Sequence, residues 1–229
     1  VSNTDGSITS SVRANQSAGF SIVTWTAAAN NPNRIGHGLN ATPKFIIVKS
    51  RSNANNWRVY TAVTGKDKYL GLNSTSGATS FNNFWSTSEP NSSTFGVWNA
   101  TGAANNDGDM VGYCFAPVEG YSAFGSYTGS GDADGPFICT GFRPRFILLK
   151  RYDASGNSWN IMDTARSTNN VVSATLLPDS NSAEGSSVSM DILSNGFKLR
   201  TSVGGPNGSS MDYIYAAFAE HPFKTARAR

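Results

Sequence analysis

The sequence predicts an all-β protein made of two tandem, duplicated antiparallel β-sandwich units with little helix. Three observations lead to this fold class. Gly, Ser, Asn and Thr make up about 42% of the 229 residues, and each of these residue types weakens a helix or competes with its backbone hydrogen bonds. Apolar side chains form short clusters bounded by turn residues, as in strands. Five blocks of sequence also recur in the same order about one hundred residues further on.

The recurring blocks divide the chain into two similar units, residues 19–122 and 123–229. The longest block is Thr42–Lys49, which returns as Arg143–Lys150. The other matched pairs are Thr24–Thr26 with Ser126–Thr128, Asn56–Trp57 with Ser158–Trp159, Phe95–Val97 with Phe197–Leu199, and Asp109–Val111 and Phe115–Ala116 with Asp212–Ile214 and Phe218–Ala219. Blocks repeated in one order at a nearly constant offset indicate an internal duplication.

The first 18 residues, 1–18, are expected to form an extended lead-in ahead of the first unit. They are mostly polar, and Val1, Ile8 and Val12 are their only apolar aliphatic residues. Such a segment buries too little apolar surface to fold alone. Because the chain starts at Val1 rather than Met, we expect this segment to connect the first unit to an upstream region, and any binding loops to lie away from it.

Each unit is predicted to begin its core at a buried strand. Phe45–Val48 and Phe146–Leu149 are unbroken apolar runs, as in strands covered on both faces. Trp57–Tyr60 and Phe197–Arg200 alternate between apolar and polar residues, which favours strands with one wet face. Two further segments, 66–72 and 169–177, could hold a helical turn. The two cysteines, Cys114 and Cys139, are predicted to be buried thiols because each lies in an apolar cluster.

Charge and hydropathy exclude several classes of protein. A net charge of +3 over 229 residues is too small to indicate nucleic-acid binding. No apolar stretch is long enough for a transmembrane helix, so no membrane insertion is expected. No basic segment precedes the first apolar cluster, as a signal peptide would require.

The sequence offers no convincing catalytic set, and we expect no enzyme activity, no catalytic residues and no cofactor. The two histidines, His37 and His221, occupy different positions in the two units and read as surface or turn residues. A pair of carboxylates for glycoside cleavage would have to come from Glu89, Glu119, Glu184 and Glu220. Glu119 and Glu220 lie near equivalent ends of the two units, where a structural role is more natural.

Two acidic turns leave a calcium site open as an alternative. Asp132 and Asp134, and likewise Asp107 and Asp109, lie on Gly-rich turns whose oxygens suit Ca²⁺. Neither turn continues into a twelve-residue calcium loop, and tight turns use Asp and Gly in any case. We therefore expect no metal site, while the sequence leaves open whether these residues hold Ca²⁺.

Sugar binding is the sharpest functional hypothesis, with Trp85, Trp98, Arg51 and Asn55 as candidate binding residues. The duplication separates core tryptophans from the others: Trp57 matches Trp159 and Trp25 matches Tyr127, so these are expected in the core. Trp98 matches Arg200 instead, and Trp85 has no aromatic counterpart. The alternative is that Phe84–Trp85 covers a sheet edge or contacts another subunit.

The chain resembles a repeated domain of unknown biochemical function from structural proteins of tailed bacteriophages, especially marine and cyanobacterial phages. The stretches that carry the resemblance cover nearly all residues past 18: Gly19–Val23, Gly36–Leu39, Pro43–Lys49, Tyr113–Ala116, Gly120–Ser122, Gly141–Pro144, Asp163–Arg166, Leu193–Phe197, Tyr213–Tyr215 and Phe218–Lys224.

The resemblance implies a non-enzymatic virion protein. Its expected role is host attachment within a tail fibre. The alternatives are a head decoration or capsid-fibre protein, and a carbohydrate-degrading adhesin. It further implies other virion proteins as partners, self-association as a trimer, and a host-surface glycan as a possible ligand.

Overall fold

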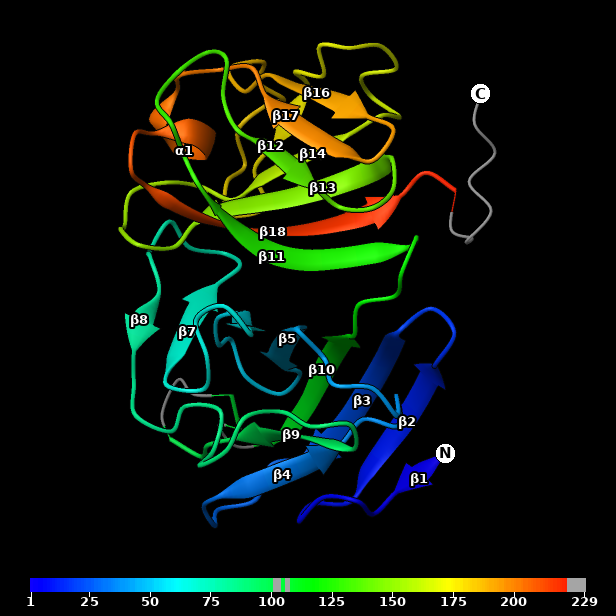
Figure 1. The fold of residues 1–229 in the computed structure, drawn as a ribbon. Coiled ribbons are helices and arrows are strands. Elements are labelled where there is room, and N and C mark those ends of the chain that lie inside the picture. The colour runs from blue at the N-terminus through cyan, green and yellow to red at the C-terminus, as the bar shows by residue number, and fades with distance from the viewer. Residues whose placement is uncertain (101–103, 106–107, 222–229) are drawn as a thin grey trace. The chain divides into compact units, whose positions relative to one another are not determined.

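The computed structural model describes residues 1–100, 104–105 and 108–221. Nearly all of its regular structure is β (Figure 1), and its strands pair in antiparallel fashion. A single four-residue helix, α1 (Gly204–Asn207), is the exception among these residues. None of the described helical structure is long or apolar enough to cross a membrane. The all-β class predicted from the sequence is therefore confirmed.

Unit 1 comprises Val1–Leu72 and Ala78–Pro117. Its main sheet has the order β1-β2-β3-β10-β5-β6-β7-β8, and a two-stranded sheet, β4-β9, covers one face of it. The strands are β1 (Ser2–Asn3), β2 (Ser10–Asn15), β3 (Phe20–Thr26), β4 (Asn33–Gly36), β5 (Phe45–Ser50), β6 (Arg58–Thr61), β7 (Lys68–Gly71), β8 (Thr79–Ser80), β9 (Thr94–Val97) and β10 (Asp109–Phe115).

Unit 2 comprises Asn73–Gly77 and the chain from Val118 onward. A five-stranded sheet, β11-β18-β13-β14-β15, packs against a three-stranded sheet, β12-β17-β16. The strands are β11 (Ser122–Thr128), β12 (Phe137–Cys139), β13 (Pro144–Arg151), β14 (Asn160–Asp163), β15 (Thr175–Leu176), β16 (Met190–Leu193), β17 (Gly196–Leu199) and β18 (Asp212–Ala219).

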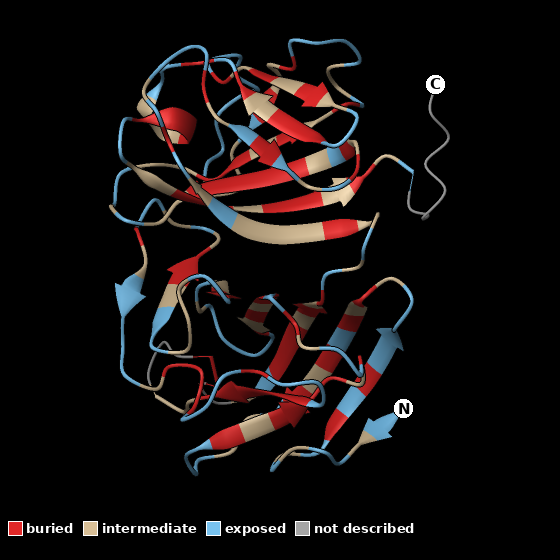
Figure 2. Cartoon of the chain, viewed as in Figure 1, coloured by how far each residue is buried: buried red, intermediate tan, exposed pale blue. Residues whose placement is uncertain are grey.

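A core lies between the two sheets of each unit, because alternate side chains of the strands turn inward. Buried and exposed positions alternate along β2 and β3 (Figure 2), as a sheet with one covered face requires. In unit 1 the rings of Trp25 and Phe95 join the sheets, with centroids 5.7 Å apart. In unit 2 Tyr127 and Phe197 occupy the corresponding strands, with centroids 6.3 Å apart.

The two units share strand order at every block that repeats in the sequence. The order β3-β10-β5-β6 of unit 1 reappears as β11-β18-β13-β14 in unit 2. Register agrees as well: Thr26 pairs with Asp109, and Thr128 pairs with Asp212. The threonine hydroxyl donates to the aspartate in both places, over 3.1 Å and 2.8 Å. The origin of both units from one duplicated sequence stays a prediction that this agreement supports.

One register pair shows how the two cores accommodate different side chains. Val23 lies opposite Gly112 in unit 1, whereas Gly125 lies opposite Tyr215 in unit 2. A Cβ on Gly125 would lie 2.9 Å from the Tyr215 hydroxyl oxygen. The glycine lies on β10 in unit 1 but on β11, the counterpart of β3, in unit 2. Each pair therefore holds one glycine and one larger residue.

Several sequence expectations are corrected. Residues 1–18 are part of unit 1 rather than a separate connector, because β2 pairs along β3 and β1 pairs with β2. The boundary between the units falls after Pro117 rather than after 122, and Asn73–Gly77 belong to unit 2. The segments 66–72 and 169–177 contain β7 and β15 instead of helical turns.

The cysteine prediction was half right. Both thiols are free, and Cys114 is buried, but Cys139 is exposed. Cys114 lies on the central strand β10 and faces the core of unit 1. Cys139 ends the short strand β12, which pairs only with β17 among the described residues, and its side chain faces away from Ile138 and the core.

Candidate binding site on unit 1

An open polar depression of about 380 Å³ lies on unit 1, at the end of the main sheet where β3 finishes and β10 begins. This volume is at the small end of the range for ligand pockets. Hydroxyl-bearing residues form most of the lining, together with one cation, one anion and one aromatic residue: Ser2, Thr9, Ser10, Ser11, Thr24, Trp25, Thr26, Arg51 and Asp109.

Strand register explains why these side chains gather. Ser2 pairs with Ser11 and Ser11 pairs with Thr24, so their side chains form a row across three strands. Thr26 pairs with Asp109 in the neighbouring row. Because side chains two residues apart share a face, both rows lie on the face of the sheet opposite to the core.

Backbone hydrogen bonds fix the charged pair at the end of these rows. The Arg51 amide donates to the Asp109 carbonyl oxygen over 2.7 Å. The Asp109 amide donates to the Ser52 hydroxyl, and the Asp109 carboxylate accepts from Thr26. The Arg51 side chain is exposed and its guanidinium makes no ion pair with a described residue. A planar cation and a partly engaged carboxylate therefore stand beside a surface of hydroxyl groups.

Unit 2 carries part of the corresponding rows on β11 and β18. Ser126, Thr128 and Asp212 stand where unit 1 has Thr24, Thr26 and Asp109, and Tyr152 replaces Arg51. The described part of unit 2 has no strands corresponding to β1 and β2 beside β11. The lead-in of unit 1 therefore supplies the wall that turns a flat sheet end into a depression.

The sequence-predicted binding residues are not brought together. Arg51 lines the depression, whereas Trp98 is half-buried just after β9. Asn55 is half-buried as well, and its side-chain Nδ2 has no hydrogen-bond partner among the described residues.

Trp85 was wrongly predicted to be a surface residue. It is fully buried (0% exposed) in the core of unit 1, its indole N–H donates to the Lys68 carbonyl over 2.9 Å, and its ring meets Tyr60 edge-on at 5.7 Å. Phe84 is buried beside it. Neither residue offers apolar surface to a sugar or to another subunit. The Ser and Thr residues of the depression were missed because hydroxyl residues are frequent throughout the sequence.

His37 is buried rather than exposed, which corrects the expectation of a surface histidine. Its Nδ1 accepts from the Leu39 amide over 3.2 Å, and its Nε2 lies 3.1 Å from the Asn91 carbonyl oxygen. Those partners fix the neutral tautomer with the proton on Nε2. Burial lowers the pKa of His37 because it disfavours the imidazolium form, and this effect outweighs the hydrogen bond to Asn91. His221 is exposed.

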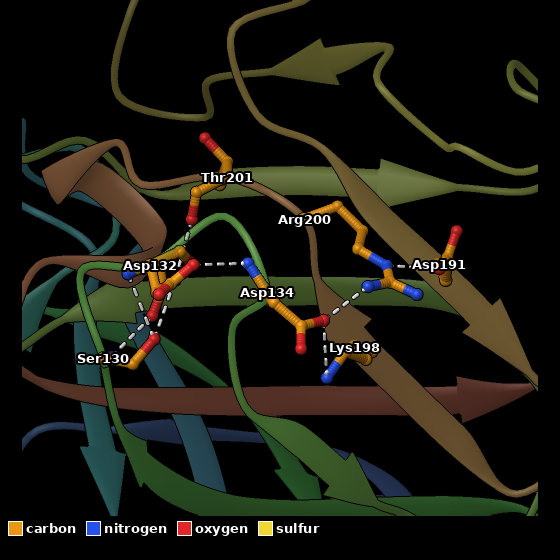
Figure 3. Close-up of polar contacts among 8 residues, drawn as sticks. Ser130, Asp132, Asp134, Asp191, Lys198, Arg200 and Thr201 are labelled. Carbon is orange, nitrogen blue, oxygen red and sulfur yellow. Dashed lines mark hydrogen bonds and ion pairs between the residues drawn. The ribbon is translucent and has the colours of Figure 1, made fainter.

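The acidic turn around Asp132 is occupied by protein contacts (Figure 3). Asp134 pairs with Lys198 over 3.1 Å and with Arg200 over 2.6 Å. The hydrogen bond from Lys198 is the main reason why the pKa of Asp134 lies below its usual value. Asp132 accepts from the Asp134 amide over 2.9 Å. Calcium would need the carboxylate of Asp134 as a ligand, but two cations already pair with it. This arrangement favours an ion-pair cluster over a metal site.

Asp107, of the other acidic turn, lies outside the described residues. Within the described parts of the chain, no group of three or more His, Cys, Asp or Glu side chains is arranged to hold a metal ion.

Glu89, Glu184 and Glu220 accept hydrogen bonds from donors within the described residues. Glu89 accepts from the Tyr60 hydroxyl over 2.7 Å and from the Lys66 amide over 2.9 Å. Glu184 accepts from Arg166 over 2.8 Å, and Glu220 accepts from Arg143 over 2.7 Å. Carboxylates engaged by the protein's own donors in this way are less available for the acid and base steps of glycoside cleavage.

The fold and the depression define an all-β protein of two sandwich-like units with an open polar surface site. The chain belongs to a domain family of unknown function, DUF7483, whose model matches residues 1–222 and therefore includes the lead-in and both units. No curated protein and no solved structure gives a significant match.

Proposed function

We propose that this chain is a non-enzymatic structural module of a virion, of the tail-fibre type, that takes part in attachment to a host cell. The observation that carries the proposal is the open depression on unit 1, whose hydroxyl groups and single charged pair suit binding of a polar surface ligand. The resemblance to structural proteins of tailed phages supports the virion location, with other virion proteins as partners.

The polar groups support binding rather than turnover. Retaining and inverting glycosidases need two carboxyl groups facing one another across the sugar. Among the described residues, Asp109 is the sole carboxylate that lines the depression, and it already accepts a hydrogen bond from Thr26. The glutamate contacts described above point the same way. We therefore rank host attachment above the polysaccharide-degrading alternative.

Immunogold labelling of intact particles with antibody against this chain tests the proposed location. Gold at the tail tip or fibres is expected. Gold confined to the capsid would contradict the tail-fibre role and favour a head decoration. Release of reducing sugar from host surface polysaccharide by the purified chain would contradict the non-enzymatic role, whatever the location.

Self-association as a trimer is part of the proposal and rests on the resemblance to phage fibre proteins, which close by threefold symmetry. The burial of Phe84 and Trp85 removes the apolar patch that sequence analysis offered as the contact surface. Light scattering during size-exclusion chromatography gives the mass directly. A single species of about 24 kDa at micromolar concentration would contradict self-association of this chain.

A further inference from the structure

The charges around the depression on unit 1 favour an anionic ligand. Arg51 lines it, and Lys49 lies on the same sheet face, next to Thr24 across β10, since Val111 pairs with both of them. Arg13 lies on this face one row further along β2. Asp109 is the only acid in the lining that the structure describes. A negatively charged group therefore meets more cations than anions on this face.

The described lining offers no accessible aromatic ring. Trp25 is its only aromatic residue, and only 4% of that residue is exposed, because its ring is packed in the core. Stacking of a sugar ring on an aromatic face is therefore not available. The remaining uncharged residues are serines and threonines, whose hydroxyls both donate and accept hydrogen bonds. A ligand with hydroxyl groups around a small ring matches this surface.

The guanidinium of Arg51 adds geometric selectivity. Its parallel N–H groups match the two oxygens of a carboxylate, which makes such pairs stronger than neutral hydrogen bonds. Asp109 has one oxygen engaged by Thr26 over 3.1 Å, so its second oxygen can accept from a ligand hydroxyl. The two charged side chains thus address two different parts of one ligand.

We propose that this depression binds one saccharide unit that carries a carboxylate, of the uronic acid type. Arg51 pairs with the ligand carboxylate, Asp109 accepts from a ring hydroxyl, and Ser11, Thr24 and Thr26 hydrogen-bond the remaining hydroxyls. This inference deepens the proposed attachment function and rests on it for its biological meaning, although the binding itself is measured without a host.

The lead-in makes the site specific to unit 1. Ser2, Thr9 and Ser11 all come from residues 1–18, and unit 2 has the equivalents of Thr24, Thr26 and Asp109 without such a wall. The proposal therefore requires one binding site per chain. It also reverses the sequence-based expectation that binding loops lie away from the lead-in.

The test is a titration of the ¹⁵N-labelled chain with methyl glucuronide, followed by amide chemical shifts, with methyl glucoside as the neutral probe. We expect one site per chain, with shift changes at residues 9–11, 24–26, 51 and 109. The wild type should bind methyl glucoside about tenfold or more weakly than methyl glucuronide, and the Arg51→Gln variant should bind methyl glucuronide more weakly by a similar factor. This is the scale of one lost charge-assisted pair. Asp212→Asn, the equivalent change in unit 2, is the matched control and should leave affinity unchanged.

Several results would overturn the proposal. One is equal affinity of the Arg51→Gln variant and the wild type for methyl glucuronide, and another is equal affinity of the wild type for glucuronide and glucoside. The others are shift changes centred on residues 126–128 and 212, and no binding at millimolar methyl glucuronide. Thermal unfolding of each variant shows whether it is folded. The two proposals fail separately: if the wild type and Arg51→Gln attach equally to host cells and also bind glucuronide equally, the attachment function stands and this site is wrong. If glucuronide binds but gold labels only the capsid, the site stands and the tail-fibre role is wrong.

Discussion

A buried lysine in unit 2 makes the stability of the protein depend on pH in the alkaline range. Lys150 lies on β13 and is fully buried (0% exposed). Its ammonium donates to the backbone carbonyl of Asn157. The carboxylate oxygens of Asp179 are buried and have no hydrogen-bond partner among the described residues. Burial lowers the pKa of Lys150 from 10.5 to about 8, an effect that the charge of Asp179 partly offsets.

The lowered pKa gives the sign and the size of the effect. The unfolded chain binds a proton at this lysine up to about pH 10.5, whereas the folded chain loses it above about pH 8. Between these values the unfolded state holds more protons, so the free energy of unfolding rises with pH. The full rise corresponds to about 3 kcal/mol, and it is absent below pH 8, where both states are protonated.

The experiment compares urea unfolding of the wild type and Lys150→Met at steps from pH 7 to 10.5. Methionine keeps most of the side-chain volume and removes the titrating group. The difference in free energy of unfolding, wild type minus variant, should rise by about 2–3 kcal/mol across this range. Taking the difference cancels the titration of other groups. Absolute stability at pH 7 is less informative, because the substitution also leaves Asp179 without its cation.

Lys49 provides the matched control, since it is the residue of unit 1 that corresponds to Lys150. It is only partly buried, and its ammonium donates to two backbone carbonyls, those of Ser50 and Asn53, over 2.9 and 3.1 Å. Lys49→Met therefore serves as the comparison at the equivalent position of unit 1, where the lysine is not fully buried. If the free energy of unfolding changes with pH in the same way for Lys150→Met and the wild type, the reasoning is refuted. The buried amine would then bind a proton equally in the folded and unfolded states.

Three further predictions concern other buried groups. Acidification from pH 7 to 5 should destabilise the wild type more than His37→Gln in urea unfolding, because the lowered pKa of His37 means that only the unfolded state gains the proton near pH 6.5; equal losses would contradict this. Trp85→Ala should reduce stability by about 3–5 kcal/mol in the same assay and Trp98→Ala by much less, whereas a well-folded Trp85→Ala variant would contradict the core assignment. Gly125→Ala should destabilise by about 1–3 kcal/mol because its Cβ meets the ring of Tyr215, and the double variant Gly125→Ala/Tyr215→Leu should recover part of the loss if that clash is the cause.

The repeated blocks show how far the sequence alone leads. The apolar runs Phe45–Val48 and Phe146–Leu149 lie in β5 and β13, because apolar runs and turn residues act within a few positions of the chain. The same local signals predicted strands at Trp57–Tyr60 and Phe197–Arg200, where the structure has β6 and β17. The all-β class and the matching strand positions of the two units therefore followed from local chemistry and from the repeat.

The candidate site and several burial states depended on contacts between distant residues. Trp85 occurs among polar neighbours, and only the strands around it make it a core residue. The lead-in looks unstructured by composition, yet its backbone hydrogen bonds to β3 order it and place Ser11 beside Thr24. Of the residues in the depression, the sequence singled out Arg51 as a binding residue and Asp109 only as a possible Ca²⁺ ligand. Local pattern can assign a residue to a strand and a face, but which strands become neighbours, and so which side chains meet, is decided by tertiary pairing.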